Sequence, residues 1–494
     1  MNKQIGRVTV VALLLLVALV VGTTYWQAWA VGGLAARQDN AIQRVAQFHI
    51  RRGLIYAADG TLLAARRAVK VKGQTFYFRR YPNGGLAAQV VGYSTQSRSR
   101  AGLERSENDY LTASNSHLNT VVRRTLDSLK GVTVTGNNLW LTIRPKAQEV
   151  ALKALGDNCG SAVAIEPSTG RVLVMASSPT YNSSLVEGHF AQIARGAHKA
   201  KCTPGAPLVN RATDGLYTPG STFKVVTAAA ALDTGLYKPD SEFDDKGYCE
   251  EYGKKVLNFA DQSGPEVFGH VDFTTALEHS INAVFCEIGK KLGPLRLLDY
   301  AKRFGFYQEP PLETPSSERI PSGLYDRGKL FRPHDPNQVD PGRFAFGQER
   351  LQVTPLQMAM VVAVIANGGA VMRPYVVDRI TAPGGGTVFR THPHALSKAV
   401  SPQTAATLTQ MMEKVVESGT GTAAQIPGIK VAGKTGTAET GVSHVNTTSF
   451  IAFAPADHPQ VAVAVYLENQ HGVGGHTAAP IAKQIIEALL RSRP

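Results

Sequence analysis

The sequence lacks the features that define several large protein classes. Its four cysteines form no CxxC pair, which argues against a cysteine-based zinc or iron–sulfur framework. Glycine (47 residues) and proline (27 residues) show no collagen-like period, and there is no internal repeat or low-complexity tail. Only one apolar run is long enough to cross a membrane, which excludes a polytopic transporter. The 494 residues, 43% of them hydrophobic, are enough for roughly two to four packed domains.

Positive charge is concentrated in one part of the chain. The net charge is +14, and residues 31–150 contain 18 basic but only 7 acidic residues, which leaves residues 151–494 nearly neutral. A nucleic-acid enzyme usually carries its basic charge near its chemistry, so no nucleic-acid partner is expected. The basic region can serve attraction to anionic lipid or an anionic wall polymer, or it can be a solvated basic face.

The N-terminal segment has the pattern of a membrane anchor. Lys3 and Arg7 precede an apolar stretch, and residues 8–30 are long enough to span about 30 Å as a helix with aromatic residues at its end. Residues 28–30 also fit the A-x-A cleavage site of a signal peptide. We favour an uncleaved single-pass anchor in residues 1–30, with a cytoplasmic N-terminus and an extracytoplasmic remainder.

An extracytoplasmic location changes the interpretation of the cysteines, because an even number of them can form disulfides there. Cys249 and Cys286 flank one loop-rich stretch, and Cys159 and Cys202 flank another. We expect a Cys249–Cys286 bond first, although four cysteines allow three pairings. Buried free thiols are the alternative.

A change in the predicted secondary structure along the sequence indicates two domains after the anchor. Residues 31–50 resemble a short helical stalk. From there to about residue 150, the sequence contains short strand-like segments interrupted by turns. Two strands at 160–165 and 171–175, joined by a turn, then begin a larger domain. We predict a mixed membrane-proximal pedestal at 31–150 and a second domain at 151–494.

The first chemical motif is Ser221-Thr-Phe-Lys224, which follows a Pro-Gly turn and opens an apolar, Ala-rich helix that should be buried. Ser221 and Lys224 are three residues apart and therefore share a helical face. A serine hydroxyl needs a nearby base, and burial or a second cation can make a lysine neutral enough to act as one. Taken alone, the pattern also fits a serine N-cap with an unrelated lysine.

The second motif is Ser280-Ile281-Asn282, within a predicted helix or helix–turn at 276–289. Residues two apart do not share a helical face, so the motif should have a loop-like start. A hydroxyl at Ser280 could relay a proton, and the Asn282 carboxamide could hold a substrate amide. Alone, this motif carries no specific information.

The third motif is Lys434-Thr435-Gly436-Thr437, in a segment that we predict to be an edge strand. Lys434 supplies a cation for a carboxylate, Gly436 allows a substrate backbone to approach, and the Thr437 N–H can serve an oxyanion. Residues 428–435 also match the phosphate-binding pattern G-x-x-x-x-G-K-T. That loop requires a helix directly afterwards, and the glycine-containing sequence that follows Thr435 disfavours a helix.

The three motifs in this order are together characteristic of penicillin-binding proteins and serine β-lactamases. With its anchor and N-terminal region, the chain resembles a class B penicillin-binding protein, and most closely the small actinobacterial penicillin-binding protein A type. The likeness extends from residue 52 onward and includes further segments at Arg52–Ile55, Asn210–Ala212, Gly347–Gln348, Thr354–Gln357 and Ala366–Gly369.

The resemblance implies D,D-transpeptidation of peptidoglycan stem peptides in cell-wall synthesis and division, with β-lactams as inhibitors. In that scheme Ser221 is the nucleophile, Lys224 its base and Ser280 the proton relay to the leaving amine. Asn282 holds the acyl-side amide, and Lys434, Thr435 and Thr437 bind the terminal carboxylate beside Gly436. The backbone N–H groups of Ser221 and Thr437 form the oxyanion hole.

The resemblance also implies an α+β fold, with an antiparallel sheet between helical layers and a mixed, dimerisation-like pedestal. It implies no metal or cofactor. No glycosyltransferase domain fits residues 31–150, so a glycosyltransferase partner should polymerise the glycan.

Other functions share parts of this pattern. A D,D-carboxypeptidase or β-lactamase would contain all three motifs, although residues 309–313 match the β-lactamase E-x-x-L-N loop poorly, with Glu313 in place of Asn. A penicillin-sensing receptor would need a cytoplasmic signalling domain, and only seven residues precede Val8. A catalytically dead scaffold is disfavoured because all three motifs are intact.

Overall fold

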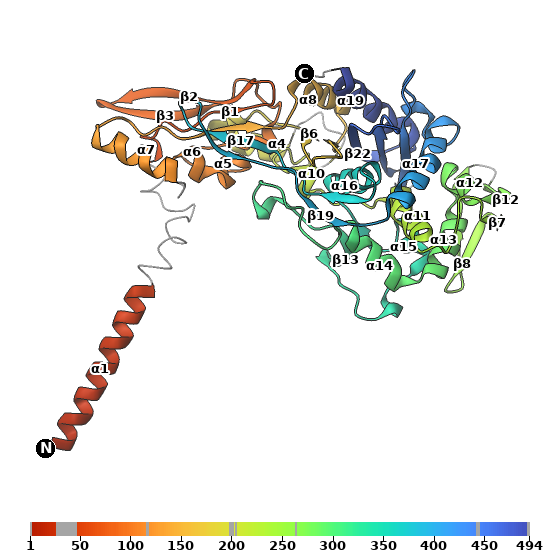
Figure 1. Ribbon diagram of the computed structural model, residues 1–494, viewed down its shortest axis with the longest axis horizontal. Helices are drawn as coiled ribbons and strands as arrows, with labels where there is room; N and C mark the ends of the chain where they lie inside the picture. The colour runs from red at the N-terminus through yellow and green to blue at the C-terminus, as the bar shows by residue number, and fades with distance from the viewer. Residues whose placement is uncertain are drawn as a thin grey trace.

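The computed structural model describes residues 2–25, 47–114, 118–196, 202, 205–261, 264–440 and 445–491. Figure 1 shows the N-terminal helix α1 (Asn2–Thr24), an elongated pedestal and a larger domain of helices around a sheet. The stalk expected at 31–50 lies almost wholly outside the described residues, as do Trp26 and Trp29.

Helix α1 contains a segment that is long and apolar enough to cross a membrane. Gly6–Thr24 has a mean hydropathy of 2.3, and none of it is buried against the rest of the described chain. Among the described residues it is the one helix with this property. The finding fits a single N-terminal anchor.

A five-stranded antiparallel sheet organises the larger domain, with strand order β20-β21-β22-β5-β6. The predicted hairpin is confirmed, because β5 (Gly160–Ile165) pairs with β6 (Val172–Ser178) around a tight turn. The three C-terminal strands are β20 (Ala432–Glu439), β21 (Asn446–Ala454) and β22 (Val461–Gln470). Among the described residues, strand β20 pairs with β21 alone, so it forms an edge of the sheet.

Helices cover both faces of this sheet. On one face, α8 (Pro145–Leu155) packs beside α19 (Ala479–Arg491), where the strands present residues such as Ala162 and Ala452. The opposite face presents Val163 and Ile451 to α16 (Pro355–Ala366). This alternation follows from the two-residue period of a strand.

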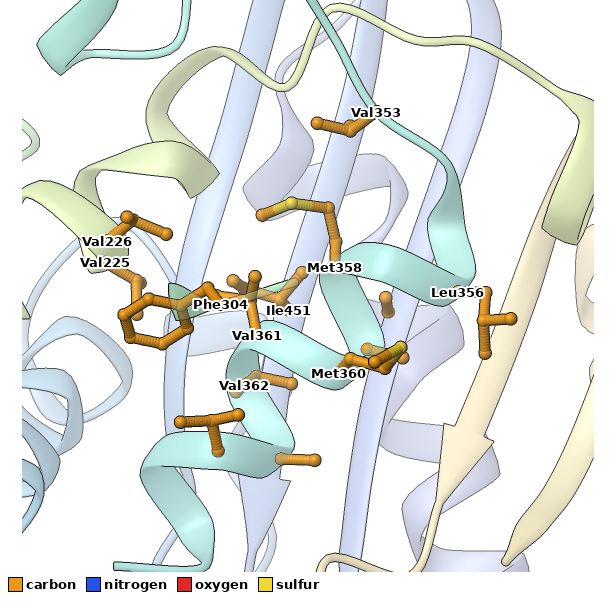
Figure 2. Packing of buried hydrophobic residues seen from close by; sticks show 14 of the residues in the cluster. Val225, Val226, Phe304, Val353, Leu356, Met358, Met360, Val361, Val362 and Ile451 are labelled. Atoms are coloured by element: carbon orange, nitrogen blue, oxygen red, sulfur yellow. The ribbon is translucent and has the colours of Figure 1, made fainter. Parts of the chain in front are cut away.

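The helix that carries Lys224 is part of the deepest core. Figure 2 shows Val225 and Val226 of α11 (Lys224–Asp233) near Phe304 and the methionines and valines of α16 (Pro355–Ala366). Residues 224–231 are all buried, as expected from the apolar sequence of α11. Tight packing on every side fixes the start of α11 in place.

The pedestal contains a six-stranded mixed sheet, with order β18-β17-β4-β1-β2-β3. Its own strands are β1 (Ile55–Tyr56), β2 (Leu62–Val71), β3 (Gln74–Arg80) and β4 (Asn138–Leu141). Two strands come from far along the chain, β17 (Val377–Thr381) and β18 (Thr387–Arg390), and β17 pairs antiparallel with β4 (Figure 1). The pedestal sheet is therefore completed by residues from the larger domain, which the sequence did not predict.

Part of the pedestal's positive charge is internal. Arg52 and Arg79 both form ion pairs with the fully buried Glu104, at 2.7 and 2.6 Å. Burial alone would raise the pKa of Glu104, but the two guanidinium groups outweigh it and hold that pKa below its usual value. Several exposed basic side chains lie on the long β2–β3 hairpin, at Arg67, Lys70, Lys72 and Arg80, and others, such as Arg98 and Lys130, lie elsewhere on the pedestal.

The structure contains two disulfides, Cys249–Cys286 and Cys159–Cys202. The first is the pair that we expected. It joins α13 (Asn282–Leu292), which follows α12 (Phe273–Glu278), to the insertion, which is the set of small hairpins between α11 and α12 in the chain. The strands of the insertion are β7 (Glu242–Asp245), β8 (Tyr248–Glu251), β9 (Lys254–Leu257), β10 (Ala260–Asp261), β11 (Gly264–Pro265) and β12 (Gly269–Asp272).

The other described elements complete the two parts of the chain. In the pedestal, they are α4 (Ala88–Val91), α5 (Leu103–Ser106), α6 (Asn108–Leu111) and α7 (Leu118–Leu129). In the larger domain, the remaining helices are α9 (Val186–Arg195), α10 (Arg211–Asp214), α14 (Pro294–Arg303), α15 (Pro341–Ala345), α17 (Pro402–Glu417) and α18 (Gly474–Thr477). Its small strands are β13 (Gly323–Asp326), β14 (Lys329–Leu330), β15 (Leu351–Gln352), β16 (Ala370–Met372) and β19 (Ala395–Lys398).

Candidate active site

The turn that carries Ser221 is held rigidly. A short 3₁₀ helix, η3 (Gly220–Phe223), precedes α11, so Ser221 lies on this tight turn and Lys224 is the first residue of the α-helix. Gly220 has a φ of +53°, and its N–H donates to the Gly347 carbonyl at 3.0 Å. A Cβ on Gly347 would lie 2.0 Å from the Gly220 carbonyl oxygen, so this contact requires glycine.

Lys224 is fully buried and joins the first motif to the second. Its Nζ donates to the Ser280 carbonyl at 2.6 Å, to Asn282 Oδ1 at 2.8 Å and to Ser280 Oγ at 3.2 Å. Burial lowers the pKa of Lys224 well below its ordinary value, and the charge of Lys434 lowers it further. Both effects shift Lys224 toward the uncharged form that a general base requires.

The second motif has the loop-like start that its spacing predicted. Ser280 adopts a φ of +61°, Ile281 is extended, and α13 begins at Asn282. The Asn282 side chain faces two ways, because Oδ1 accepts from Lys224 while Nδ2 donates to the Leu257 carbonyl at 3.1 Å. Its oxygen is thus occupied by the lysine.

The third motif lies on the edge strand that we predicted. Lys434 is fully buried in β20, and burial lowers its pKa to about 7. Thr435 Oγ1 lies 2.7 Å from Thr420 Oγ1, and Thr437 Oγ1 accepts from the Gly474 N–H at 3.2 Å. The strand continues to Glu439 with no helix after the lysine, so the phosphate-binding loop is excluded.

Glycines bring the third motif against the serine turn. A Cβ on Gly436 would lie 2.8 Å from the Pro219 carbonyl oxygen and 2.3 Å from Ser449 Oγ. A Cβ on Gly220 would lie 2.8 Å from the Thr437 carbonyl oxygen. The Ser449 side chain and the Pro219 backbone therefore require glycine at position 436. The approach of a substrate backbone at this position stays a prediction.

A buried hydroxyl pair, which sequence reasoning missed, supports this turn from beneath. Thr222 Oγ1 lies 2.8 Å from the Tyr466 hydroxyl and donates to the Pro219 carbonyl at 2.8 Å. Tyr466 comes from β22, so it links the central sheet to the nucleophile turn. Nothing in the local sequence indicates this contact, since the two residues are 244 positions apart.

The geometry combines three elements of acyl-transfer chemistry. A half-buried serine lies on a turn packed against an edge strand, a buried lysine is poised to be neutral, and a second lysine lies on that strand. Glu309 belongs to a surface loop, where its carboxylate accepts from Ser316 Oγ at 2.8 Å. The Pro-rich surface loop expected at 309–313 is only partly exposed, because Leu312 is buried and the Glu313 carboxylate accepts from the Val376 N–H at 2.8 Å.

Comparison with known proteins agrees with this arrangement. The family model for the penicillin-binding protein transpeptidase domain matches residues 160–487. The chain belongs to this family. The model for the penicillin-binding protein A dimerisation domain matches residues 52–139, within the predicted pedestal.

Relatives of this penicillin-binding transpeptidase match along its whole length. Peptidoglycan D,D-transpeptidase PbpA of Mycolicibacterium smegmatis is 37% identical over 99% of both chains. The protein of the same name from Mycobacterium tuberculosis is 34% identical over 100% of both chains. The fold matches that of M. tuberculosis penicillin-binding protein A, solved as a ceftriaxone acyl-enzyme, with a TM-score of 0.80 over 90% of this chain and 100% of that one.

These matches confirm the predicted family, α+β fold and serine transpeptidase class. The same solved protein is also described as a penicillin G acyl-enzyme, with a TM-score of 0.78. The hydrolase and receptor alternatives have no support among these relatives.

Proposed function

We propose that this chain cross-links peptidoglycan stem peptides by D,D-transpeptidation, through an acyl-enzyme on Ser221. The observation that carries the proposal is the position of Lys224, which is fully buried, bonded to Ser280 and Asn282, and disfavoured as a cation by Lys434. The relatives named as D,D-transpeptidases support the substrate class.

In the acylation step, Ser221 Oγ attacks the carbonyl carbon between the two terminal D-Ala residues. Lys224 takes the hydroxyl proton, and the N–H groups of Ser221 and Thr437 stabilise the developing oxyanion, a contribution of about 3 kcal/mol for each donor. The C–N bond then breaks. Ser280 passes the proton from Lys224 to the departing amine, so the last D-Ala leaves as a neutral amine and the acyl group stays on Ser221.

In the second step, an amine from a neighbouring stem attacks the ester. Its proton returns through Lys224 to Ser221 Oγ as the new amide forms, so the enzyme is regenerated without net proton uptake. The close packing of Gly220 against Thr437 supports a shared oxyanion site for both steps. Asn282 combines its proposed hold on the substrate amide with the orientation of Lys224.

Benzylpenicillin tests this proposal directly. After incubation, intact-mass spectrometry of the full chain should show a stable adduct with the mass of the complete drug, located on Ser221 by peptide mapping. This outcome is expected because a transpeptidase deacylates slowly in water. Absence of an adduct with the drug intact would contradict an activated serine, and hydrolysed drug without an adduct would favour a hydrolase.

Replacing Lys434 with alanine should weaken carboxylate recognition. The apparent dissociation constant for benzylpenicillin should rise by about 10- to 100-fold, the scale of a lost charged hydrogen bond. Because the pKa of Lys434 is lowered to about 7, its positive charge is present below that pH and is lost above it. Wild-type affinity should therefore fall as the pH rises through 7, and the variant should lack this dependence.

Stopped-flow acylation of Lys434→Ala at a series of drug concentrations separates the dissociation constant of benzylpenicillin from the limiting acylation rate constant. A control variant, Lys153→Ala, changes an exposed lysine of α8. An unchanged dissociation constant in Lys434→Ala would rule out the carboxylate role.

We also propose that α1 anchors the protein in the cell membrane, with a cytoplasmic N-terminus and an extracytoplasmic catalytic domain. The apolar helix supports an anchor, and Lys3 and Arg7 at its start favour this orientation. A role in division and a glycosyltransferase partner stay predictions. Residues 160–487 and 52–139 match the transpeptidase and dimerisation family models, and neither model describes glycan polymerisation.

A further inference from the structure

The inserted region at residues 242–272 contacts the second motif directly. The Leu257 carbonyl, at the end of β9, accepts from Asn282 Nδ2 at 3.1 Å. The neighbouring Asn258 Oδ1 accepts from the Ala283 N–H at 2.9 Å. Two consecutive residues of the insertion therefore hold the first two residues of α13.

The contact with Ala283 replaces a missing helix cap. The first N–H groups of an α-helix have no partner within the helix and are usually satisfied by the side chain of the preceding residue. In α13 the preceding residue is Ile281, which has no polar side chain and makes no capping bond. Asn258 supplies the cap from a segment 25 residues earlier.

Asn258 is itself fixed by a buried carboxylate. It is 4% exposed, and its Nδ2 donates to both oxygens of Asp245, at 3.0 and 2.8 Å, and to the Glu266 carbonyl at 3.0 Å. Asp245, also 4% exposed, accepts in addition from the N–H groups of Gly247 and Phe268. The Asp245–Asn258 pair thus ties the strands of the insertion together at the point where they meet α13.

We propose that Asn258, supported by Asp245, is a positioning residue that orients the Asn282 carboxamide toward Lys224. The inference rests on the proposed function and extends it from the three motifs to the insertion. With Nδ2 of Asn282 held by the Leu257 carbonyl, Oδ1 must point the other way, toward the lysine. Loss of the cap frees α13 to shift at its first turn and lets the carboxamide rotate.

Such a rotation changes the surroundings of the general base. The groups that face Lys224 Nζ are the Ser280 carbonyl and hydroxyl, Asn282 Oδ1, the Phe285 ring at 5.1 Å and the cation of Lys434. Oδ1 favours the ammonium form, so its loss moves the ionisation of Lys224 to lower pH. A defect in general stability alone would leave the pH at which acylation begins unchanged.

The test compares Asn258→Ala with wild type in the full chain, by quenched-flow acylation with benzylpenicillin between pH 5 and 9. The limiting acylation rate constant should fall by about 10- to 100-fold, the scale for a small displacement of a catalytic group, while the dissociation constant changes little. The acid limb of the pH profile should move down by about half a pH unit.

Two further variants keep the test decisive. Lys254→Ala changes an exposed residue of β9 in the same insertion and should behave as wild type. Asp245→Asn is isosteric and leaves the Asn258 cap in place, so it should give the same changes in reduced size even if Asn258→Ala folds poorly.

Each outcome has a distinct meaning. Wild-type rates and pH profiles in folded Asn258→Ala and Asp245→Asn proteins would overturn the positioning role while the proposed function stands. A rate loss with an unmoved pH profile would also overturn it, because the effect would then be structural only. Failure of the wild-type chain to form any adduct would instead contradict the proposed function.

Discussion

Replacing Ser221 with alanine is expected to abolish covalent labelling by benzylpenicillin. The acylation rate should fall by about 10⁶-fold, the scale for removal of a serine nucleophile. The fold should persist, because the described Ser221 side chain is half-buried and the turn is held by the backbone contacts of Gly220 and by Thr222. A change in unfolding free energy within about 0.5 kcal/mol is expected.

Intact-mass spectrometry and thermal unfolding check this expectation together. A Ser221→Cys variant is a useful comparison, since it keeps a nucleophile of similar size at the same place. Covalent labelling of Ser221→Ala at a different residue would show that the nucleophile had been misassigned.

Replacing Lys224 with methionine should lower the limiting acylation rate by about 10²- to 10⁴-fold, the usual contribution of a general base. Methionine matches the length of the lysine stem and suits the apolar surroundings near Phe285. Removing a buried amine stabilises the fold, whereas the carbonyl of Ser280 and Asn282 Oδ1 lose their donor. These effects oppose each other, so the unfolding free energy should stay within about 2 kcal/mol.

For Lys224→Met, urea unfolding measures the free energy of unfolding and quenched-flow acylation measures the limiting acylation rate. The exposed Lys153, changed to methionine, controls for the substitution itself. Acylation at the wild-type rate in a folded Lys224→Met protein would show that another group removes the proton from Ser221.

Local sequence was sufficient to predict the form of each motif. The spacing of Ser221 and Lys224 predicted a shared helical face, and the spacing of Ser280 and Asn282 predicted a break before α13. Both features follow from the three- to four-residue repeat of a helix, which involves only near neighbours. The position of Lys434 on an edge strand was likewise predicted from the strand-like, glycine-containing sequence around it.

The joining of these motifs could not be derived from local sequence. Strand β20 reaches the serine turn only because β5, β21 and β22 pair in an order that depends on contacts far apart in the chain. The resemblance to penicillin-binding proteins supplied that arrangement. The same limit explains why Asn258 was missed, since a single asparagine in a loop-rich region has no pattern that separates a cap for a distant helix from an ordinary turn residue.

The strands β17 and β18 limit how this protein can be divided or recombined. Cutting the chain near residue 150 would remove β4 from β17 and leave the edge of β17 with unpaired backbone groups, the usual template for aggregation. A chimera that exchanges the pedestal between relatives must therefore exchange residues 377–390 as well. The pedestal is thus built from two separate pieces of sequence, which meet in contacts such as the hydrogen bond from Trp140 Nε1 to Thr381 Oγ1, between residues 241 positions apart.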